Sequence, residues 1–293
     1  MIKNCIFLFS PLMKLRISMW FFAVFFSVIL SGCAFSPQKL YYVYNGLPKE
    51  DFIRHEQIKN IYFEKNGSDF ADAVAKIYER DKKQIEISHG FEFRQEHNVF
   101  LCVTKECYDK YAVVTAAGAE THYSGEIILN GRKLIAENRV ESILTHELSH
   151  AVWYENGVGC MPRWWEEGLA VLTSSGGGAE MTSVEEATKS IKAGKVFEPI
   201  DASSCRVFFG GDLSKKYGIS WSMYYRQSEM FVKFLKERDG AAFKMTLRSL
   251  KENKNIYKSI VNSYGKSVQQ LWGEWIESVK NSNLSKESNR QNT

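Results

Sequence analysis

The hydrophobic pattern is most regular between residues 140 and 155, where apolar residues recur at the spacing of one helix face. Their positions are Ile143, Leu144, Leu148, Ala151 and Val152. His146 and His150 lie beside this stripe, and residues 135–155 include no proline or glycine. The pattern predicts a mostly buried helix with a short polar strip, which is the setting that an internal metal site requires.

Elsewhere, short apolar runs alternate with longer amphipathic segments. Strands are predicted at 58–64, 98–104 and 126–130, and helices at 68–87, 223–236, 243–250, 256–264 and 268–279. Asn156-Gly157 and Pro162 predict that the buried helix ends there and that a second helix occupies about 163–173. The chain is therefore expected to be α+β, with a small mixed sheet followed by a helical C-terminal region.

The buried helix contains the pattern H-E-x-x-H at 146–150. Residues four apart share a helix face, so His146 and His150 can offer ring nitrogens to one Zn²⁺. Glu147 is one step round the helix and can take a proton from water that the metal has acidified. A catalytic zinc usually has three protein ligands and one open position, so these histidines alone are an incomplete site.

A second motif, P-R-W-W-E-E-G-L-A at 162–170, offers a third ligand from the helix that follows. Glu166 and Glu167 are both candidates, because consecutive helix positions are only about 100° apart. Spacing alone leaves this choice open.

Together, H-E-L-S-H and P-R-W-W-E-E-G-L-A resemble the zinc sites of gluzincins, the thermolysin-like class of zinc metallopeptidases, and are closest to its small peptidase domains. The resemblance implies a zincin-like catalytic domain with Glu167 as third ligand and Glu147 as general base and then acid. Glu166 is then expected to be an exposed acid favoured by the helix dipole. Thermolysin has an Asp four residues after the third ligand, where this chain has Val171, so a histidine-orienting partner must come from elsewhere.

The same resemblance implies features of a substrate cleft. The strand at 126–130 is expected to be a sheet edge to which an extended substrate adds as one more strand, so that 123–130 lines the cleft. An ordinary structural role in the core is the alternative. Tyr225 is expected to stabilise the reaction oxyanion, with Tyr224 and Tyr217 as alternatives and helix packing as an equally open role. His122 lies near this strand but is not expected to be functional, since the ligand set is complete without it.

The N-terminal segment has the pattern of an export signal. An apolar run at 20–30 follows two basic residues and ends in Leu-Ser-Gly-Cys33, which resembles a bacterial lipobox. Cleavage of a signal peptide at 1–32 and lipid attachment to Cys33 are therefore expected, with Met1 or Met13 as the true start. Ala34 favours the outer membrane of a Gram-negative cell, by resemblance to sorted lipoproteins. An uncleaved membrane helix is the alternative.

The charge and the cysteine usage of the chain are consistent with export. The formal net charge is +4, part of it from the signal segment, and there is no basic patch interleaved with aromatics, so nucleic-acid binding has no support. Four cysteines follow the lipobox, and outside the cytosol they are expected to pair as Cys102–Cys107 and Cys160–Cys205, with free thiols as the alternative.

The predicted parts are a signal peptide at 1–32, a membrane-proximal segment at 33–57, a catalytic domain at 58–215, a helical region at 216–280 and a disordered tail at 281–293. The Gly-rich stretch at 174–178 is expected to be a mobile loop that can gate the cleft. The expected function is hydrolysis of a peptide bond in an envelope protein or cell-wall peptide by a lipid-anchored zinc metallopeptidase. A non-catalytic zinc scaffold and a peptidoglycan amidase are the alternatives.

Overall fold

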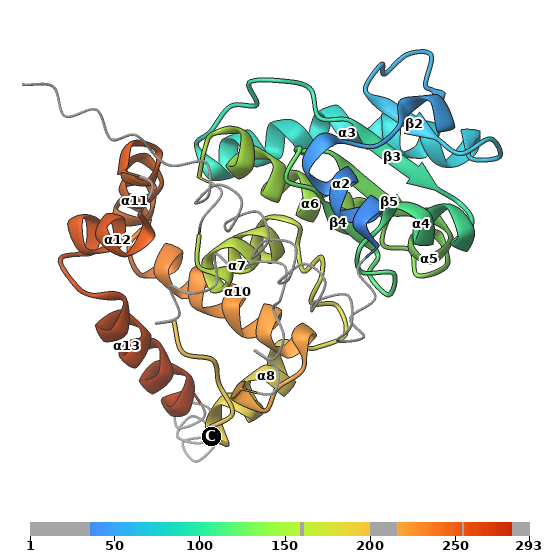
Figure 1. Ribbon diagram of the computed structural model, residues 1–293. Coiled ribbons are helices and arrows are strands. Elements are labelled where there is room, and N and C mark those ends of the chain that lie inside the picture. The colour runs from blue at the N-terminus through green and yellow to red at the C-terminus, as the bar shows by residue number, and fades with distance from the viewer. Residues whose placement is uncertain (1–35, 159–160, 200–215, 254, 283–293) are drawn as a thin grey trace, which may run out of the picture.

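The computed structural model describes residues 36–158, 161–199, 216–253 and 255–282 (Figure 1). The predicted signal segment and lipid site, Cys160, Cys205 and the predicted tail beyond residue 282 lie outside these ranges. No helix within them is long and apolar enough to cross a membrane. The fold is mixed α and β, as predicted, with a small sheet and a helical C-terminal region.

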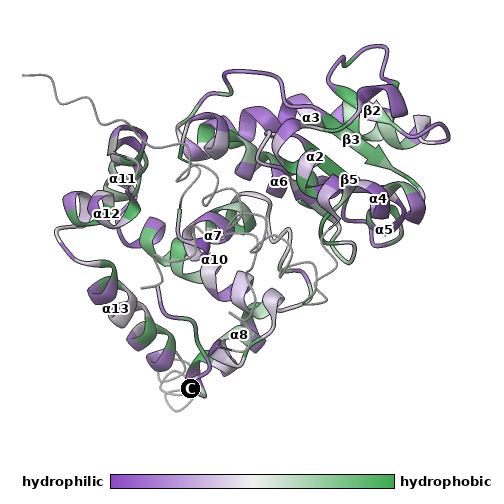
Figure 2. Ribbon diagram, in the orientation of Figure 1, coloured by the Kyte–Doolittle hydropathy of each residue, from purple (hydrophilic) through white to green (hydrophobic). Residues whose placement is uncertain are grey.

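The sheet has five strands in the order β1-β2-β3-β5-β4. Their bounds are β1 Ile53–Arg54, β2 Ile61–Phe63, β3 Val99–Cys102, β4 Ala119–Thr121 and β5 Ile127–Asn130. The three central strands β2, β3 and β5 run parallel, and β1 and β4 are antiparallel edges. β3, whose four residues are all apolar and buried, is green in Figure 2.

The sheet edge differs from the one predicted. The strand before the buried helix, β5, lies between β3 and β4 and is therefore internal, and the edge is β4, which pairs Thr121 with Ile127. The pattern concealed β4 because it has only three residues, of which Glu120 and Thr121 are polar. Pairing becomes possible because Gly125, at φ +81°, turns the chain back between the two strands.

Alternate side chains of the strands point to opposite faces of the sheet, and each face packs in its own hydrophobic core. On one face, Ile61, Leu101 and Ile127 contact α3 (Ser68–His89) and α6 (Val140–Glu155). On the other face, Phe100 and Ile128 pack with residues of α2 (Pro37–Asn45) and α4 (Lys105–Tyr111). Two short elements, η1 (Lys49–Asp51) and α5 (Gly131–Ala136), connect these layers.

The predicted buried helix is α6, and every one of its residues from 143 to 153 is buried. Two of its polar side chains, Thr145 and Ser149, have partners on α3. The Thr145 hydroxyl donates to Asp81 Oδ2 at 3.0 Å, and Ser149 Oγ lies 2.7 Å from His89 Nε2. These contacts satisfy buried polar groups and fix the rotation of α6 about its axis.

The second motif forms α7 (Arg163–Thr173), with the bounds that the sequence predicts. α7 packs along α10 (Trp221–Arg238) at the centre of the molecule (Figure 1). Gly168 is needed at this crossing, because a Cβ there would lie 2.6 Å from the backbone oxygen of Ser228. The glycine of the motif thus sets how closely α7 approaches α10.

The remaining helices are α8 (Val184–Lys192), α11 (Gly240–Asn253), α12 (Ile256–Tyr264) and α13 (Val268–Asn281). α8 was not predicted, whereas the last three follow the predicted segments. The larger core continues from the sheet into this region through Phe231, Leu235 and Trp275. The predicted disulfide Cys102–Cys107 is present.

Candidate metal centre

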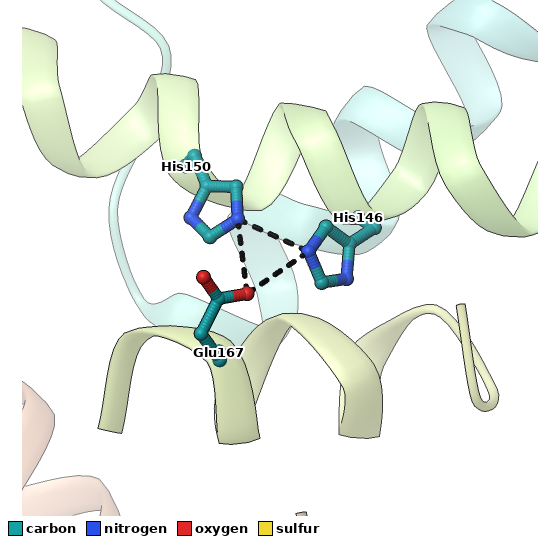
Figure 3. Close-up of side chains that lie close together, drawn as sticks. All are labelled: His146, His150 and Glu167. Carbon is teal, nitrogen blue, oxygen red and sulfur yellow. Dashed lines mark hydrogen bonds and ion pairs between the residues drawn. The ribbon is translucent and has the colours of Figure 1, made fainter. Parts of the chain in front are cut away.

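Three predicted ligands converge between α6 and α7 (Figure 3). His146 and His150 extend from one helix and Glu167 from the other. All three are buried, with exposed fractions of 4%, 8% and 6% respectively. Within the described parts of the chain, this is the only group of three such residues whose ligand atoms all lie close together.

The distances among the ligand atoms match a small metal ion. The two Nε2 atoms lie 3.1 Å apart, and Glu167 Oε2 lies 3.2 Å from His146 Nε2 and 3.6 Å from His150 Nε2. A tetrahedral site with bonds of about 2.0–2.1 Å places its ligand atoms roughly 3.3–3.4 Å apart. The triangle therefore has the size that one first-row metal ion requires.

The outer nitrogen of His146 is held by a backbone carbonyl. His146 Nδ1 lies 2.9 Å from the oxygen of Gly177, and this contact places the ring proton on Nδ1. The Nε2 lone pair then faces the centre, as a metal ligand needs. The Gly177 carbonyl is thus an orienting partner for a candidate ligand histidine, which the sequence left unassigned.

That carbonyl belongs to the Gly-rich stretch predicted to be a mobile loop. In the structure its glycines serve close packing. A Cβ on Gly177 would lie 2.3 Å from the Ser142 oxygen, and one on Gly178 would lie 3.0 Å from His146 Cε1. The residues that follow the stretch are tied to α10, because Arg226 donates to the backbone oxygens of Ala179 and Thr182.

Glu166 was expected to be an exposed acid, and that expectation is wrong. Its exposed fraction is 9%, and its Oε1 lies 3.2 Å from His150 Nδ1, an ion-pair contact that lacks the alignment of a hydrogen bond. α6 packs against α7, and Glu166 faces His150 of α6. Glu166 and Glu167 therefore have separate positions, one on the outer nitrogen of His150 and one at the centre.

The charges of the three ligands are coupled. Burial lowers the pKa of His150, but Glu167 and Glu166 raise it well above its usual value. Burial raises the pKa of Glu167, but the two histidines lower it well below its usual range. Positive charge on His150 thus balances the carboxylates when no metal is bound. A divalent cation in the centre can replace that charge, with release of the proton.

Glu147 follows His146 on α6 and is not one of the three clustered ligands. It is buried, with an exposed fraction of 7%, and its Oε2 accepts a 2.7 Å hydrogen bond from the Thr121 hydroxyl. The same hydroxyl also lies 3.0 Å from the Glu147 backbone oxygen. Thr121 is on the edge strand β4, so the sheet edge contacts the predicted general base.

Of the three candidate tyrosines, Tyr225 is the one that reaches the cluster. Its hydroxyl donates to Glu167 Oε1 at 3.0 Å, and its ring stacks on His146 at 6.1 Å between centroids. Tyr224 packs in the larger core, and the Tyr217 hydroxyl donates to the Glu198 oxygen. His122 is buried, and its Nε2 lies 3.5 Å from Glu120 Oε2. It is not among the clustered ligands.

Arg163 also contacts the centre, which sequence reasoning missed. Its Nη1 donates to Glu167 Oε1 at 3.5 Å, and its guanidinium lies over the Trp221 ring at 5.4 Å. Its place four residues before Glu167, on the same face of α7, was the signal available in the sequence.

Compared with models of known families, with curated proteins and with solved structures, the chain matches none of them. The assignment of a function therefore depends on the site itself.

Proposed function

We propose that this protein is a zinc metallopeptidase that hydrolyses peptide bonds in the cell envelope. The observation that carries the proposal is Glu147, a buried carboxylate that follows His146 on α6 and is not one of the three clustered ligands. A metal that serves only structure needs ligands and no such acid. A hydrolytic site needs a base near the reacting water.

The ligand set supports zinc and a catalytic type of site. Two imidazole nitrogens and one carboxylate oxygen suit zinc, whereas calcium and magnesium prefer all-oxygen sites. Three protein ligands leave one position open, while structural zinc sites usually have four. When bound, the ion would polarise the substrate carbonyl and make a water molecule more acidic.

The side chains of this chain would then perform the proton transfers. Glu147 accepts a proton from the attacking water as the water oxygen forms its bond to the peptide carbonyl carbon. It then passes that proton to the amide nitrogen as the C–N bond breaks. Thr121 holds the Glu147 carboxylate during both transfers. Burial and Glu167 raise the pKa of Tyr225 well above its usual value, so its hydroxyl remains protonated. That hydroxyl donates to Glu167 Oε1 here, and it would turn to the oxyanion during the reaction while Arg163 stays on the carboxylate.

The proposed location is the outer face of a bacterial membrane, through lipid on Cys33 and without nucleic-acid partners. The Cys102–Cys107 disulfide supports export, because disulfides persist in oxidising compartments. Metabolic labelling with a fatty-acid analogue is expected to mark the chain and to fail for Cys33→Ala. Labelling that persists in this variant would contradict the anchor.

The test of activity compares the full-length protein in detergent with Glu147→Gln, each after its zinc content is measured. Both are expected to hold close to one zinc per chain. The wild type is expected to cleave members of a diverse peptide library, and the variant is expected to lose this cleavage.

The alternatives give different results in the same experiment. A zinc scaffold would bind metal, and neither protein would cleave peptides or cell wall. An amidase would leave the library intact and release stem peptides from purified cell wall in a Glu147-dependent way.

A further inference from the structure

The two oxygens of the Glu167 carboxylate have different surroundings. Oε1 accepts two hydrogen bonds, from the Tyr225 hydroxyl at 3.0 Å and from Arg163 Nη1 at 3.5 Å. Oε2 is buried, accepts no aligned hydrogen bond, and lies 3.2 and 3.6 Å from the two histidine Nε2 atoms. One oxygen is therefore occupied by donors, and the other is turned toward the centre (Figure 3).

This division has a consequence for metal binding. A carboxylate oxygen has two lone pairs, and two donors occupy those of Oε1. A carboxylate that binds a metal through both oxygens fills two coordination positions, whereas one that binds through a single oxygen fills one. With the two histidines, single-oxygen binding leaves more of the ion open to water and substrate.

The side chain of Arg163 is restrained by its surroundings. It begins α7, four residues before Glu167, so both side chains lie on the same face of the helix. Its guanidinium lies over the Trp221 ring at the start of α10, and the side chain is only 18% exposed. Tyr225 reaches the same oxygen from α10, so two different helices hold the ligand.

We propose that Arg163 is a positioning residue which, together with Tyr225, restricts Glu167 to one ligating oxygen, Oε2. One remaining donor is enough to keep Oε1 from the metal. When both donors are lost, Oε1 is free to bind the metal. The inference rests on the proposed function only for the presence of the metal. It does not require that peptides be cleaved.

The test uses the full-length protein loaded with Co²⁺, whose visible absorption weakens as the coordination number rises. Wild type is compared with Arg163→Met, Tyr225→Phe and the double variant. Methionine keeps an apolar side chain against Trp221 and removes the donor. Tyr224→Phe is the matched control, because it removes the adjacent hydroxyl, which lies within electrostatic range of Glu167 and does not hydrogen-bond to it.

Each single variant is expected to absorb nearly as the wild type does, and the control to be identical to it. The double variant is expected to show a loss of absorption greater than the sum of the single changes, because the two donors share one acceptor. A double variant with the wild-type spectrum would overturn the inference. A wild-type chain that takes up no Co²⁺ or Zn²⁺ would instead overturn the proposed function.

A second measurement needs no variant and holds if the double variant fails to fold. The infrared difference between metal-loaded and metal-free wild type reports the separation of the two carboxylate stretching bands. A wide separation is expected for one ligating oxygen. A narrow separation would show that both oxygens bind and would contradict the inference.

Discussion

The metal centre has a ligand side, formed by His146, His150 and Glu167, and a base side, formed by Glu147. The two sides are held by different contacts. On the ligand side, each ligand has at least one further contact: His146 with Gly177, His150 with Glu166, and Glu167 with Tyr225 and Arg163. On the base side, Glu147 has one side-chain hydrogen bond, from Thr121. The ligand contacts come from chain that follows α6, and the base contact comes from the sheet that precedes it.

Under the proposed function, this difference means that metal binding and proton transfer would depend on separate parts of the fold. The α7–α10 pair and the loop between α7 and α8 hold the candidate ligands. The edge strand β4 holds the carboxylate of Glu147. Substitutions on the two sides should therefore affect different measurements.

The largest effect is expected for the third ligand. Glu167→Gln should abolish detectable zinc binding, because it removes a charged ligand from a buried site. Glu166→Gln should weaken binding by about 10–100-fold, as is usual for a partner of a ligand histidine. Competition with a chromophoric chelator measures both. Equal losses in the two variants would contradict the separate positions of these neighbouring acids.

A smaller effect is expected for the loop that holds His146. Gly178 has φ +86°, and a Cβ there would lie 3.0 Å from His146 Cε1. Gly178→Ala should destabilise the protein by about 1–3 kcal/mol through backbone strain. It should also weaken zinc binding, because the histidine ring must move.

The matched control is Gly194→Ala. Gly194 has φ +75° and open space around its Cβ position, so this variant carries the same kind of strain away from the metal. Thermal unfolding and zinc titration are measured for both variants. Zinc binding that weakens equally in the two would show that strain, and not displacement of His146, is the cause.

The base side should respond in activity alone. Thr121→Val removes the hydroxyl that holds Glu147 and should lower the cleavage rate by up to about 100-fold, the usual cost of a slightly misplaced catalytic group. Zinc affinity should remain unchanged, and Thr121→Ser should retain most of the activity. A loss of zinc in Thr121→Val would mean that the two sides of the site are not separate.

The smallest effect on the site is expected from the α3 side of α6. Burial, with a smaller contribution from His150, lowers the pKa of His89 to about 3. The unfolded chain has the usual histidine pKa of about 6.5, so it binds more protons than the folded chain between these values. The free energy of unfolding should therefore decrease as the pH falls from about 6.5 toward 3.

This contribution is at most about 1.4 kcal/mol per pH unit. Denaturant unfolding of the metal-free protein measures it, as the difference in pH dependence between wild type and His89→Phe. The variant should have the weaker dependence. Equal dependence in the two proteins would show that His89 is not buried in its neutral form.

The sequence predicts much of the ligand side because helical spacing is a local property. The bounds of α7 follow from Pro162 and the motif, and the pairing of His146 with His150 follows from the period of the helix. The Cys102–Cys107 pair was also predictable, because only a short loop separates the two residues.

The rest depends on packing between segments distant in the chain. The burial of Glu166 is decided by how α6 crosses α7, and a backbone carbonyl such as that of Gly177 has no side chain to signal its role. β4 escaped prediction because two of its three residues are polar, although one of them, Thr121, holds the base.

The central claim is that His146, His150 and Glu167 bind one zinc ion, and X-ray absorption at the zinc edge of the purified wild-type protein tests it most directly. The account predicts about one zinc per chain, surrounded by nitrogen and oxygen at about 2.0–2.1 Å. A shell of sulfur at about 2.3 Å would place the metal on cysteines. That result, or a protein that holds no zinc, would contradict the account.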